Sequence, residues 1–369
     1  MEAQEITDFN GQKQFLAVAN ILYRGDPNWI APLEGEVLHL LNQEQNKWLA
    51  KGSVKLWVLK DAEKGLIGRV AAFYSGRDKL GRIGFFECIH NQDAANLLFD
   101  TAVTWLQEQG LDLIEAPVQP GSREAYWGLL IDGFSRPAFQ DVYNPPYYQS
   151  LFEAYGFRKD YDQETALIRA EWFKAERLSV IADHAIAKHH YRSVGFTWKN
   201  RAKLAKDLCR VYNLAWQVHE HFQELGEAEV LELMQAMKPL MVPELIRMAY
   251  QGDEPIGFFV SLRDLNQYLR GMKGKQGLWF KLRLAMKLKF GVNRRMRAIL
   301  FGVVPEHQNR GVESVMIYDY FRAAQKMKGL DELELSWVGD FNPRMLRLLE
   351  GIGARPYKRH RTFSLRIRT

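Results

Sequence analysis

The hydrophobic and polar positions of this chain repeat in the same order in its two halves. Three pairs of segments share a pattern: a turn with Ile-Gly and an apolar strand; a helix end, Gly-Leu-Asp and a strand; and Asn-Pro, a short helix, a glycine and a closing strand. The pairs are 64–74 with 253–262, 105–118 with 324–338, and 144–159 with 342–358. Three ordered matches predict an internal repeat.

Each copy is predicted to be one α/β unit. A glycine between a helix and an apolar strand favours the left-handed conformation that ends the helix, so Gly110 and Gly329 mark equivalent corners. The second copy opens with the strand "YRSVGFTW", and apolar residues at helical spacing follow it. The prediction is a first unit at 1–170, a helical linker at 171–187 and a second unit at 188–369.

Composition places the chain among ordinary globular proteins. It has 369 residues, 47% hydrophobic and 25% charged, with a net charge of +6 and a pI of about 9.1. Its two cysteines, Cys88 and Cys209, have no metal-ligand spacing and form no disulfide framework, so neither a metal site nor secretion is expected. The first residues lack a signal-peptide pattern and no apolar run reaches membrane-spanning length, so a cytoplasmic location is expected.

The order of elements in each unit resembles the GNAT superfamily of acyl-CoA-dependent N-acyltransferases. The segment "LFGVVPEHQNRGVESVMIYDYF" (300–321) is similar to that family's fourth strand, pyrophosphate loop and following helix. The family loop reads Gln/Arg-x-x-Gly-x-Gly/Ala, and here it is Gln308-Asn309-Arg310-Gly311-Val312-Glu313. The resemblance implies an α/β fold of two tandem GNAT-like units, each a mixed central sheet flanked by helices.

The physical properties of this loop suit a phosphate. A helix N-terminus presents unpaired N–H groups and a favourable dipole, Gly311 permits close approach, and Arg310 adds a cation. The alternative is that Gly311 serves only the turn. Glu313 stands where the family has a small residue, and its carboxylate would repel a pyrophosphate by about 1 kcal/mol.

The resemblance also implies the ligands and the site residues. Acetyl-CoA or another acyl-CoA would be the co-substrate, a small-molecule amine the acceptor, and backbone N–H groups near Val303 and Val304 would hold the oxyanion. Asn342 matches a family residue that contacts the cofactor; the alternative is a simple helix N-cap. The implied cofactor-binding residues are Val303, Val304, Gln308, Asn309, Arg310, Gly311, Val312, Ser314 and Asn342.

Catalytic groups are harder to assign. The family often carries a tyrosine acid on the short helix, where this chain has Leu349 and, in the first copy, Phe152. The first copy also lacks the glycine loop and has Asp93 at that turn, so it is expected to be degenerate. Weak catalytic candidates there are Glu87, Cys88 and Tyr148; the alternative for Glu87 and Cys88 is a half-buried strand pair without a role.

Two classes of function therefore remain open. One is an N-acyltransferase that uses the second unit, and the other is a GNAT-like ligand-binding or scaffold protein without catalysis. A third class, an adenine methyltransferase, is suggested by Asn144-Pro145-Pro146-Tyr147 but lacks a glycine-rich AdoMet loop. That tetrapeptide is predicted instead to start a short helix, with Asn144 as the N-cap and Pro145 at the first helical position.

A basic insert at about 265–297 occurs only in the second copy. From Arg270 to Arg297 it holds ten Lys/Arg residues and no acidic residue, interleaved with apolar positions. Its period fits either a strand or an amphipathic helix. An anionic partner is one interpretation: a membrane surface, an acidic acceptor or the 3′-phosphate of coenzyme A. A solvated basic face is the other, and nucleic acid is not expected without a recognition motif.

Overall fold

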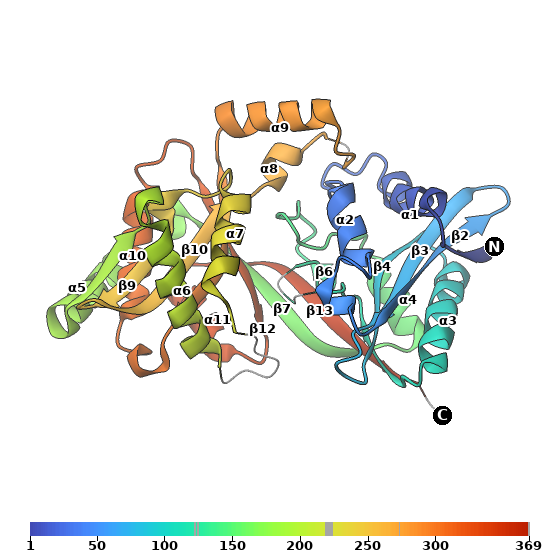
Figure 1. The fold of residues 1–369 in the computed structure, drawn as a ribbon, viewed down its shortest axis with the longest axis horizontal. Helices are drawn as coiled ribbons and strands as arrows, with labels where there is room; N and C mark the ends of the chain where they lie inside the picture. Colours follow the sequence, from blue (N-terminus) through green and yellow to red (C-terminus); the bar gives the residue numbers. More distant parts are fainter. Residues whose placement is uncertain (122, 124, 218–223, 273, 368–369) are drawn as a thin grey trace.

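The structure is a computed structural model that describes residues 1–121, 123, 125–217, 224–272 and 274–367. Two units are distinguished: the N-terminal unit comprises β1 to β7 and the C-terminal unit comprises β8 to β13. Figure 1 shows the two units side by side, joined through the long strands that cross the middle of the molecule. Lys273 of the basic insert lies outside the described residues.

The N-terminal unit begins with a short strand and two helices, continues through a three-stranded meander, and ends with a long strand. Its elements are β1 (Glu2–Glu5), α1 (Phe9–Leu22), α2 (Glu34–Leu41), the single 3-10 turn η1 (Lys47–Leu49), β2 (Ser53–Asp61), β3 (Gly65–Tyr74), β4 (Gly81–Cys88), α3 (Gln92–Glu108), β5 (Leu113–Ala116), β6 (Leu129–Asp132), α4 (Tyr148–Tyr155) and β7 (Arg158–Arg169).

The C-terminal unit follows after a helical connection and repeats this order with one insertion. The elements are η2 (Ala170–Trp172), α5 (Ala175–His189), β8 (Tyr191–Gly195), η3 (Trp198–Asn200), α6 (Arg201–Trp216), α7 (Glu227–Met237), η4 (Pro243–Leu245), β9 (Arg247–Gln251), β10 (Glu254–Arg263), α8 (Asn266–Leu269), α9 (Leu278–Phe290), β11 (Arg295–Val303), η5 (Pro305–His307), α10 (Val312–Ala324), β12 (Glu332–Gly339), α11 (Pro343–Gly351) and β13 (Arg355–Arg366).

One 13-stranded sheet runs through both units, and the two closing strands are exchanged between them. The order is β1-β2-β3-β4-β5-β13-β7-β12-β11-β10-β9-β8, with β6 beside β13. The last strand of the chain, β13, pairs with β5 through Phe363 and Ala116, whereas β7 pairs with β12 through Ile168 and Leu333. Each unit therefore completes its sheet with a strand from the other copy.

Each unit has its own apolar core, and the repeat predicted from the sequence is present. One core packs β3, β4, α3 and α4 around Leu98 and Phe152; the other packs β9 to β12, α5, α6 and α10 around Phe258 and Met316. The predicted helix-ending glycines Gly110 and Gly329 both adopt positive φ, +75° and +80°. The insert, whose period left strand and helix open, forms the helices α8 and α9.

The described part of the chain holds neither a membrane-spanning helix nor a metal-binding cluster. None of its helices is both long enough and apolar enough to cross a membrane. Nor do its His, Cys, Asp and Glu side chains gather in any group of three or more that would suit a metal ion.

Candidate functional site

The C-terminal unit is open at the point where β11 and β12 separate. These parallel strands pair only from Arg295 with Glu332 to Ala298 with Leu335, and their later residues diverge. The next residue, Ile299, forms a bulge in β11. The adjacent β10 residues Val260 and Ser261 pair with Leu300 and Ala298, so no residue of β10 pairs with Ile299. A cavity of about 1040 Å³ occupies the resulting gap.

The cavity reaches both faces of the sheet. Trp216 of α6 lines it from one face and stacks on Phe258, with ring centroids 5.8 Å apart. Tyr320 of α10 lines it from the other face and packs against Phe259. Phe258 and Phe259 are adjacent on β10 and point to opposite faces, so the cavity is lined from both sides of the sheet. The lining is largely aromatic and aliphatic.

The loop before α10 leaves a helix N-terminus without a side-chain cap. Gly311 is the N-cap residue, with φ of +86°, and no side chain caps the helix. A Cβ atom at Gly311 would lie 2.8 Å from the Cβ of Ala185 on α5. Glycine is therefore required here both for the backbone conformation and for the packing of α5. The first N–H groups of α10 remain available to an anion.

An arginine that was not predicted from the sequence holds the loop before α10 through hydrogen bonds. Arg344 of α11 donates to Oε1 of Gln308 at 3.3 Å and to Oδ1 of Asn309 at 2.5 Å. Gln308 in turn donates to the carbonyl oxygen of Val303 at 3.0 Å. Arg344 and Arg347 both line the cavity. Their spacing of three on a short helix was the available signal, because it places both on one face.

The remaining predicted residues of this region divide between the cavity and the core. Ser314 and Asn342 line the cavity, and Asn342 also caps α11 by accepting from the Met345 N–H at 3.2 Å. Glu313 lines the cavity too, on the first turn of α10. Val312, in contrast, is fully buried in the core. Arg310 is exposed and lies near Tyr191. Burial raises the pKa of the Tyr191 hydroxyl, and Arg310 opposes part of that rise.

One of the two expected oxyanion donors is already engaged. The N–H of Val304 donates to the carbonyl oxygen of Ile256 at 3.0 Å, so the expectation that it holds an oxyanion is wrong for this conformation. Consecutive N–H groups along a strand point to opposite edges. The N–H of Val303 therefore points away from β10, toward the gap, and Val303 lines the cavity.

Two relatives match nearly the whole length of the chain. No protein-family model matches the chain. Protein YghO of Escherichia coli (strain K12) is 28% identical over 383 residues, covering 97% of this chain and 93% of that protein. The bacterial ceramide synthase of Caulobacter vibrioides (strain NA1000 / CB15N) is 26% identical over 367 residues, covering 95% of this chain and 94% of that protein.

Two solved structures share the fold at low sequence identity. A tandem GNAT protein from the clavulanic acid biosynthesis pathway has a TM-score of 0.56 and 11% identity, covering 99% of this chain and 98% of that one. A GCN5-related glucosamine N-acetyltransferase region of a fungal multi-domain β-N-acetylglucosaminidase has a TM-score of 0.59 and 14% identity. That match covers 99% of this chain and 38% of the longer fungal one. The chain has a tandem GNAT fold. The predicted fold class is confirmed.

In the N-terminal GNAT unit the equivalent gap is filled. The N–H of Ile89 donates to Ile67 at 3.0 Å, as that of Val304 does to Ile256, so Cys88 corresponds to Val303. The N–H of Cys88 donates to the Tyr148 hydroxyl at 2.8 Å, and its carbonyl accepts from the Tyr147 hydroxyl at 2.8 Å. Tyr148 of α4 and the N-cap residue Tyr147 thus occupy this strand edge. In the C-terminal unit α11 carries no hydroxyl side chain, and the Val303 carbonyl accepts from Gln308 instead.

The helix that follows this strand is also closed to anions. Asn91 caps α3 by accepting from the Ala94 N–H at 2.8 Å, and Asp93 adds a carboxylate to the first turn. Phe152, at the position of the family tyrosine, is fully buried in the core. Its counterpart Leu349 lines the cavity of the C-terminal unit. Neither side chain carries a proton to donate.

The three weak catalytic candidates lie together in the N-terminal unit. Oε2 of Glu87 accepts from the hydroxyls of Tyr148 at 2.9 Å and Tyr23 at 2.8 Å, and Arg69 lies 3.3 Å from its Oε1. Burial raises the pKa of Glu87, against the opposing effect of Arg69 and the tyrosines. Burial, with Glu87, raises the pKa of Cys88 to about 12, so its thiol stays protonated at neutral pH. The adjoining cavity measures only about 100 Å³.

The Asn-Pro-Pro-Tyr segment differs from the prediction. Helix α4 begins at Tyr148 after the N-cap residue Tyr147, so Asn144 is not its cap. The buried Asn144 side chain instead accepts from the Leu130 N–H at 2.8 Å and donates to the Leu130 carbonyl at 3.0 Å. Both amide groups are thus satisfied by β6, which fixes this loop against the sheet.

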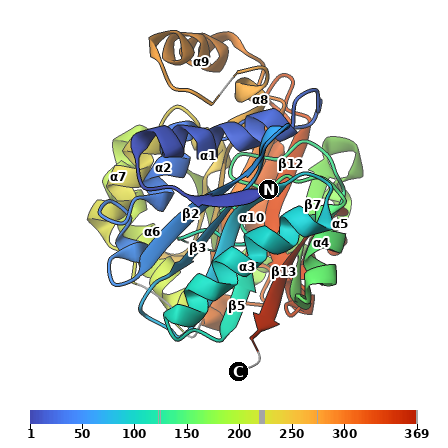
Figure 2. The same ribbon diagram turned by 90° about the vertical axis from the view of Figure 1, so that its right-hand side faces the viewer.

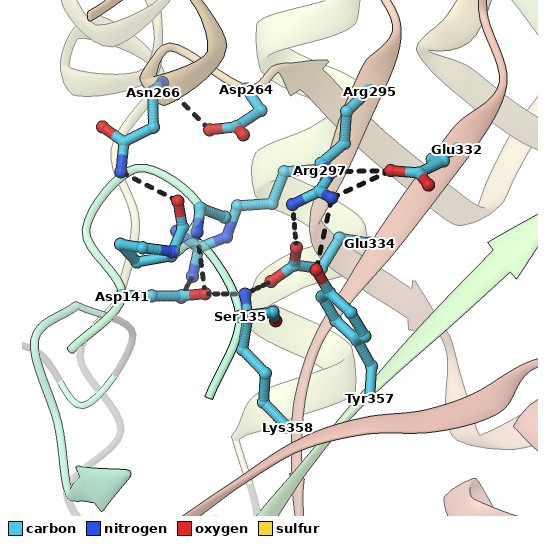
Figure 3. A network of polar contacts seen from close by, with 12 residues as sticks. Ser135, Asp141, Asp264, Asn266, Arg295, Arg297, Glu332, Glu334, Tyr357 and Lys358 are labelled. Carbon is cyan, nitrogen blue, oxygen red and sulfur yellow. Dashed lines mark hydrogen bonds and ion pairs between the residues drawn. The ribbon is translucent and has the colours of Figure 1, made fainter. Parts of the chain in front are cut away.

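A buried ionic network on β11, β12 and β13 joins the C-terminal unit to Asp141 of the N-terminal unit (Figure 3). Lys358 of β13 lies 2.6 Å from Oε1 of Glu334 and 3.3 Å from Oδ2 of Asp141, which comes from the N-terminal unit. Arg297 lies 2.6 Å from the other Asp141 oxygen, and Arg295 lies 3.0 Å from Glu334. Since each carboxylate has two cationic partners, the network positions β11 and β12, which line the cavity, relative to the N-terminal unit.

Proposed function

We propose that the protein is an acyl-CoA-dependent N-acyltransferase that works in the C-terminal GNAT unit. The observation that carries this proposal is the contrast between the two gaps. One is an apolar cavity of about 1040 Å³ beside an uncapped helix N-terminus, and the other is filled by Tyr147 and Tyr148 beside a capped helix. Only the former offers space for a thioester and donors for a pyrophosphate.

The roles of the residues follow from their positions. The N–H groups at the start of α10 would receive the pyrophosphate of acetyl-CoA or a longer acyl-CoA, with Arg310 and Arg344 supplying positive charge. The N–H of Val303 would donate to the thioester oxygen as charge develops there. The acceptor amine attacks the carbonyl carbon, a C–N bond forms, the C–S bond breaks, and the amine proton leaves with the thiol product.

The cavity lining and one relative support an acceptor class. A ceramide is an amide of a fatty acid with a long-chain amino alcohol, and the Caulobacter relative is named a ceramide synthase. The cavity is lined by side chains such as Trp216, Phe259 and Phe321, which suit an alkyl chain better than a polar one. We therefore propose a small amine with a long apolar chain as acceptor and a fatty acyl-CoA as donor.

A second function, ligand binding without catalysis, is favoured by one observation. Glu313 places a carboxylate in the first turn of α10, and no proton-donating group replaces the family tyrosine at Leu349. The two functions differ in turnover and share the binding site. Binding of acyl-CoA without release of free thiol in the presence of long-chain amines would support the non-catalytic function.

The test combines calorimetry with a turnover assay. Acetyl-CoA and long-chain acyl-CoAs are titrated into the protein, and thiol release is then followed with long-chain amines. Arg344→Gln is expected to weaken acyl-CoA binding about tenfold, since a charge-assisted hydrogen bond contributes about 1.5 kcal/mol. Arg322→Gln, on α10 outside the cavity lining, is the matched control. Absence of acyl-CoA binding at millimolar ligand would refute the proposal.

A further inference from the structure

Helix α9 carries two apolar faces, and the protein covers only one of them. Phe280, Leu284 and Leu288, at a spacing of four, pack against Leu265 and Leu269 of the preceding segment. None of the thirteen residues of α9 is fully buried. In both ribbon views α9 lies at one end of the molecule, raised from the body and reached through α8 (Figures 1 and 2).

The opposite face of α9 is apolar and open. Its exposed large side chains include Trp279, 83% exposed, and Phe290, 73% exposed. At about 100° per residue these side chains occupy about a third of the helix circumference, directly away from the packed face. The full set is Leu278, Trp279, Leu282, Met286 and Phe290. An unpartnered patch of this kind on one helix marks a contact surface.

Basic residues border this apolar face. As helical geometry places them, Arg283 lies beside one edge of the face and Lys289 within it, whereas Lys281 lies about 60° beyond the other edge. None of the three forms an ion pair with any residue that the structure describes. Lys287 differs, because its Nζ donates to the backbone carbonyls of Tyr268 and Arg270 and so anchors α9 to α8.

We propose that α9 docks the protein on an anionic lipid bilayer. An apolar arc flanked by lysine and arginine, with exposed tryptophan and phenylalanine, matches the interfacial region, where aromatic rings sit at headgroup level and basic side chains reach lipid phosphates. A second copy of the chain fits less well, since pairing two α9 helices would bring together two segments without an acidic residue. This surface lies outside the cavity lining, and membrane docking through it does not depend on acyl transfer.

Vesicle flotation with the full-length protein tests this inference. Vesicles of phosphatidylcholine alone are compared with vesicles of phosphatidylcholine and phosphatidylglycerol, at low and high salt. One variant removes the aromatic contacts, Trp279→Ala with Phe290→Ala. A second reverses the charges, Lys281→Glu, Arg283→Glu and Lys289→Glu. The matched control reverses three exposed lysines of the N-terminal unit, Lys51→Glu, Lys64→Glu and Lys79→Glu, and so carries the same change in net charge.

The expected result is binding to the anionic vesicles and much weaker binding to the neutral ones. Charge reversal on α9 should lower the partition coefficient roughly a hundredfold, and the aromatic variant roughly tenfold, whereas the control keeps most of the binding. All five substituted side chains on α9 are exposed, so unchanged thermal unfolding is expected in each variant. Absence of binding to anionic vesicles, or equal losses in the control and the α9 variants, would overturn the inference. Concentration-dependent dimerisation abolished by Trp279→Ala, without vesicle binding, would assign the face to a second copy.

Discussion

The backbone N–H of Cys88 donates a 2.8 Å hydrogen bond to the hydroxyl of Tyr148, although the two residues lie 60 positions apart. The same hydroxyl donates to Glu87 at 2.9 Å. Tyr148 therefore satisfies a strand N–H that would otherwise face the gap between β4 and β5. The equivalent position in the C-terminal unit has no such partner from α11, and there the gap is a cavity.

Tyr148→Phe is expected to destabilise the fold without affecting acyl-CoA binding. The substitution leaves a buried N–H and a buried carboxylate each short of one partner, at a cost of about 1–3 kcal/mol. Urea unfolding measures the loss. Tyr155→Phe is the control, because its hydroxyl bonds to Asp100 at the surface and should cost less than about 1 kcal/mol. A Tyr148→Phe protein as stable as the parent would show that this bond does not hold the gap closed.

Glu313→Gln is expected to tighten acyl-CoA binding. Its carboxylate lines the cavity on the first turn of α10, where the proposed pyrophosphate would sit. Removing one like charge should gain about 1 kcal/mol, or roughly fivefold in Kd. Calorimetric titration measures the change, and Glu306→Gln, exposed on η5 outside the cavity lining, is the control. Weaker binding in Glu313→Gln would show instead that the carboxylate contributes to the ligand site.

Both thiols are expected to be inert in the folded protein. Cys88 and Cys209 are buried, and burial, with nearby carboxylates, raises the pKa of Cys88 to about 12 and that of Cys209 above its ordinary value. A thiol-specific reagent at neutral pH should therefore label neither thiol until the protein is unfolded, and then both. Rapid labelling of one thiol in the native protein would contradict this. Cys88→Ala should in addition retain acyl-transfer activity.

Acid should weaken the connection between the two units through Asp141. Burial alone would raise the pKa of this carboxyl, but Arg297 and Lys358 hold it below its ordinary value. A carboxyl with a depressed pKa stabilises the fold above the pKa that it has when unfolded, and this stabilisation is lost as the pH falls through the folded value. The free energy of unfolding is therefore expected to decrease below about pH 4.

Asp141→Asn tests this contribution directly. At neutral pH it leaves Arg297 and Lys358 short of a buried partner, at a cost of about 3–5 kcal/mol. The variant should also show a shallower loss of stability as the pH falls below about 4. Asp183→Asn, at an exposed position on α5, is the control that should keep the parental slope. Identical pH profiles for parent and Asp141→Asn would remove the residue from the acid response.

Local sequence patterns were sufficient to predict the helix ends, the helix cap and the glycine loop, because a few neighbouring residues determine each of them. Positive φ at Gly110 and Gly329 and the cap of α11 by Asn342 follow from local backbone preferences, and their repetition was enough to predict two α/β units. The glycine loop before α10 was predictable for the same reason. Asn144 shows the limit, because a buried amide took long-range partners on β6 in place of the local cap.

Contacts between segments that are far apart in the sequence were decided only by the tertiary structure. The exchange of β7 and β13, the closure of one gap by Tyr148 and the contact of Arg344 with Asn309 join residues from 35 to 253 positions apart. No local pattern encodes such pairs, since they depend on which surfaces are buried together and which polar groups must then be satisfied. The same holds for α9, whose period allowed a strand or a helix until packing against α8 selected the helix and left its second apolar face open.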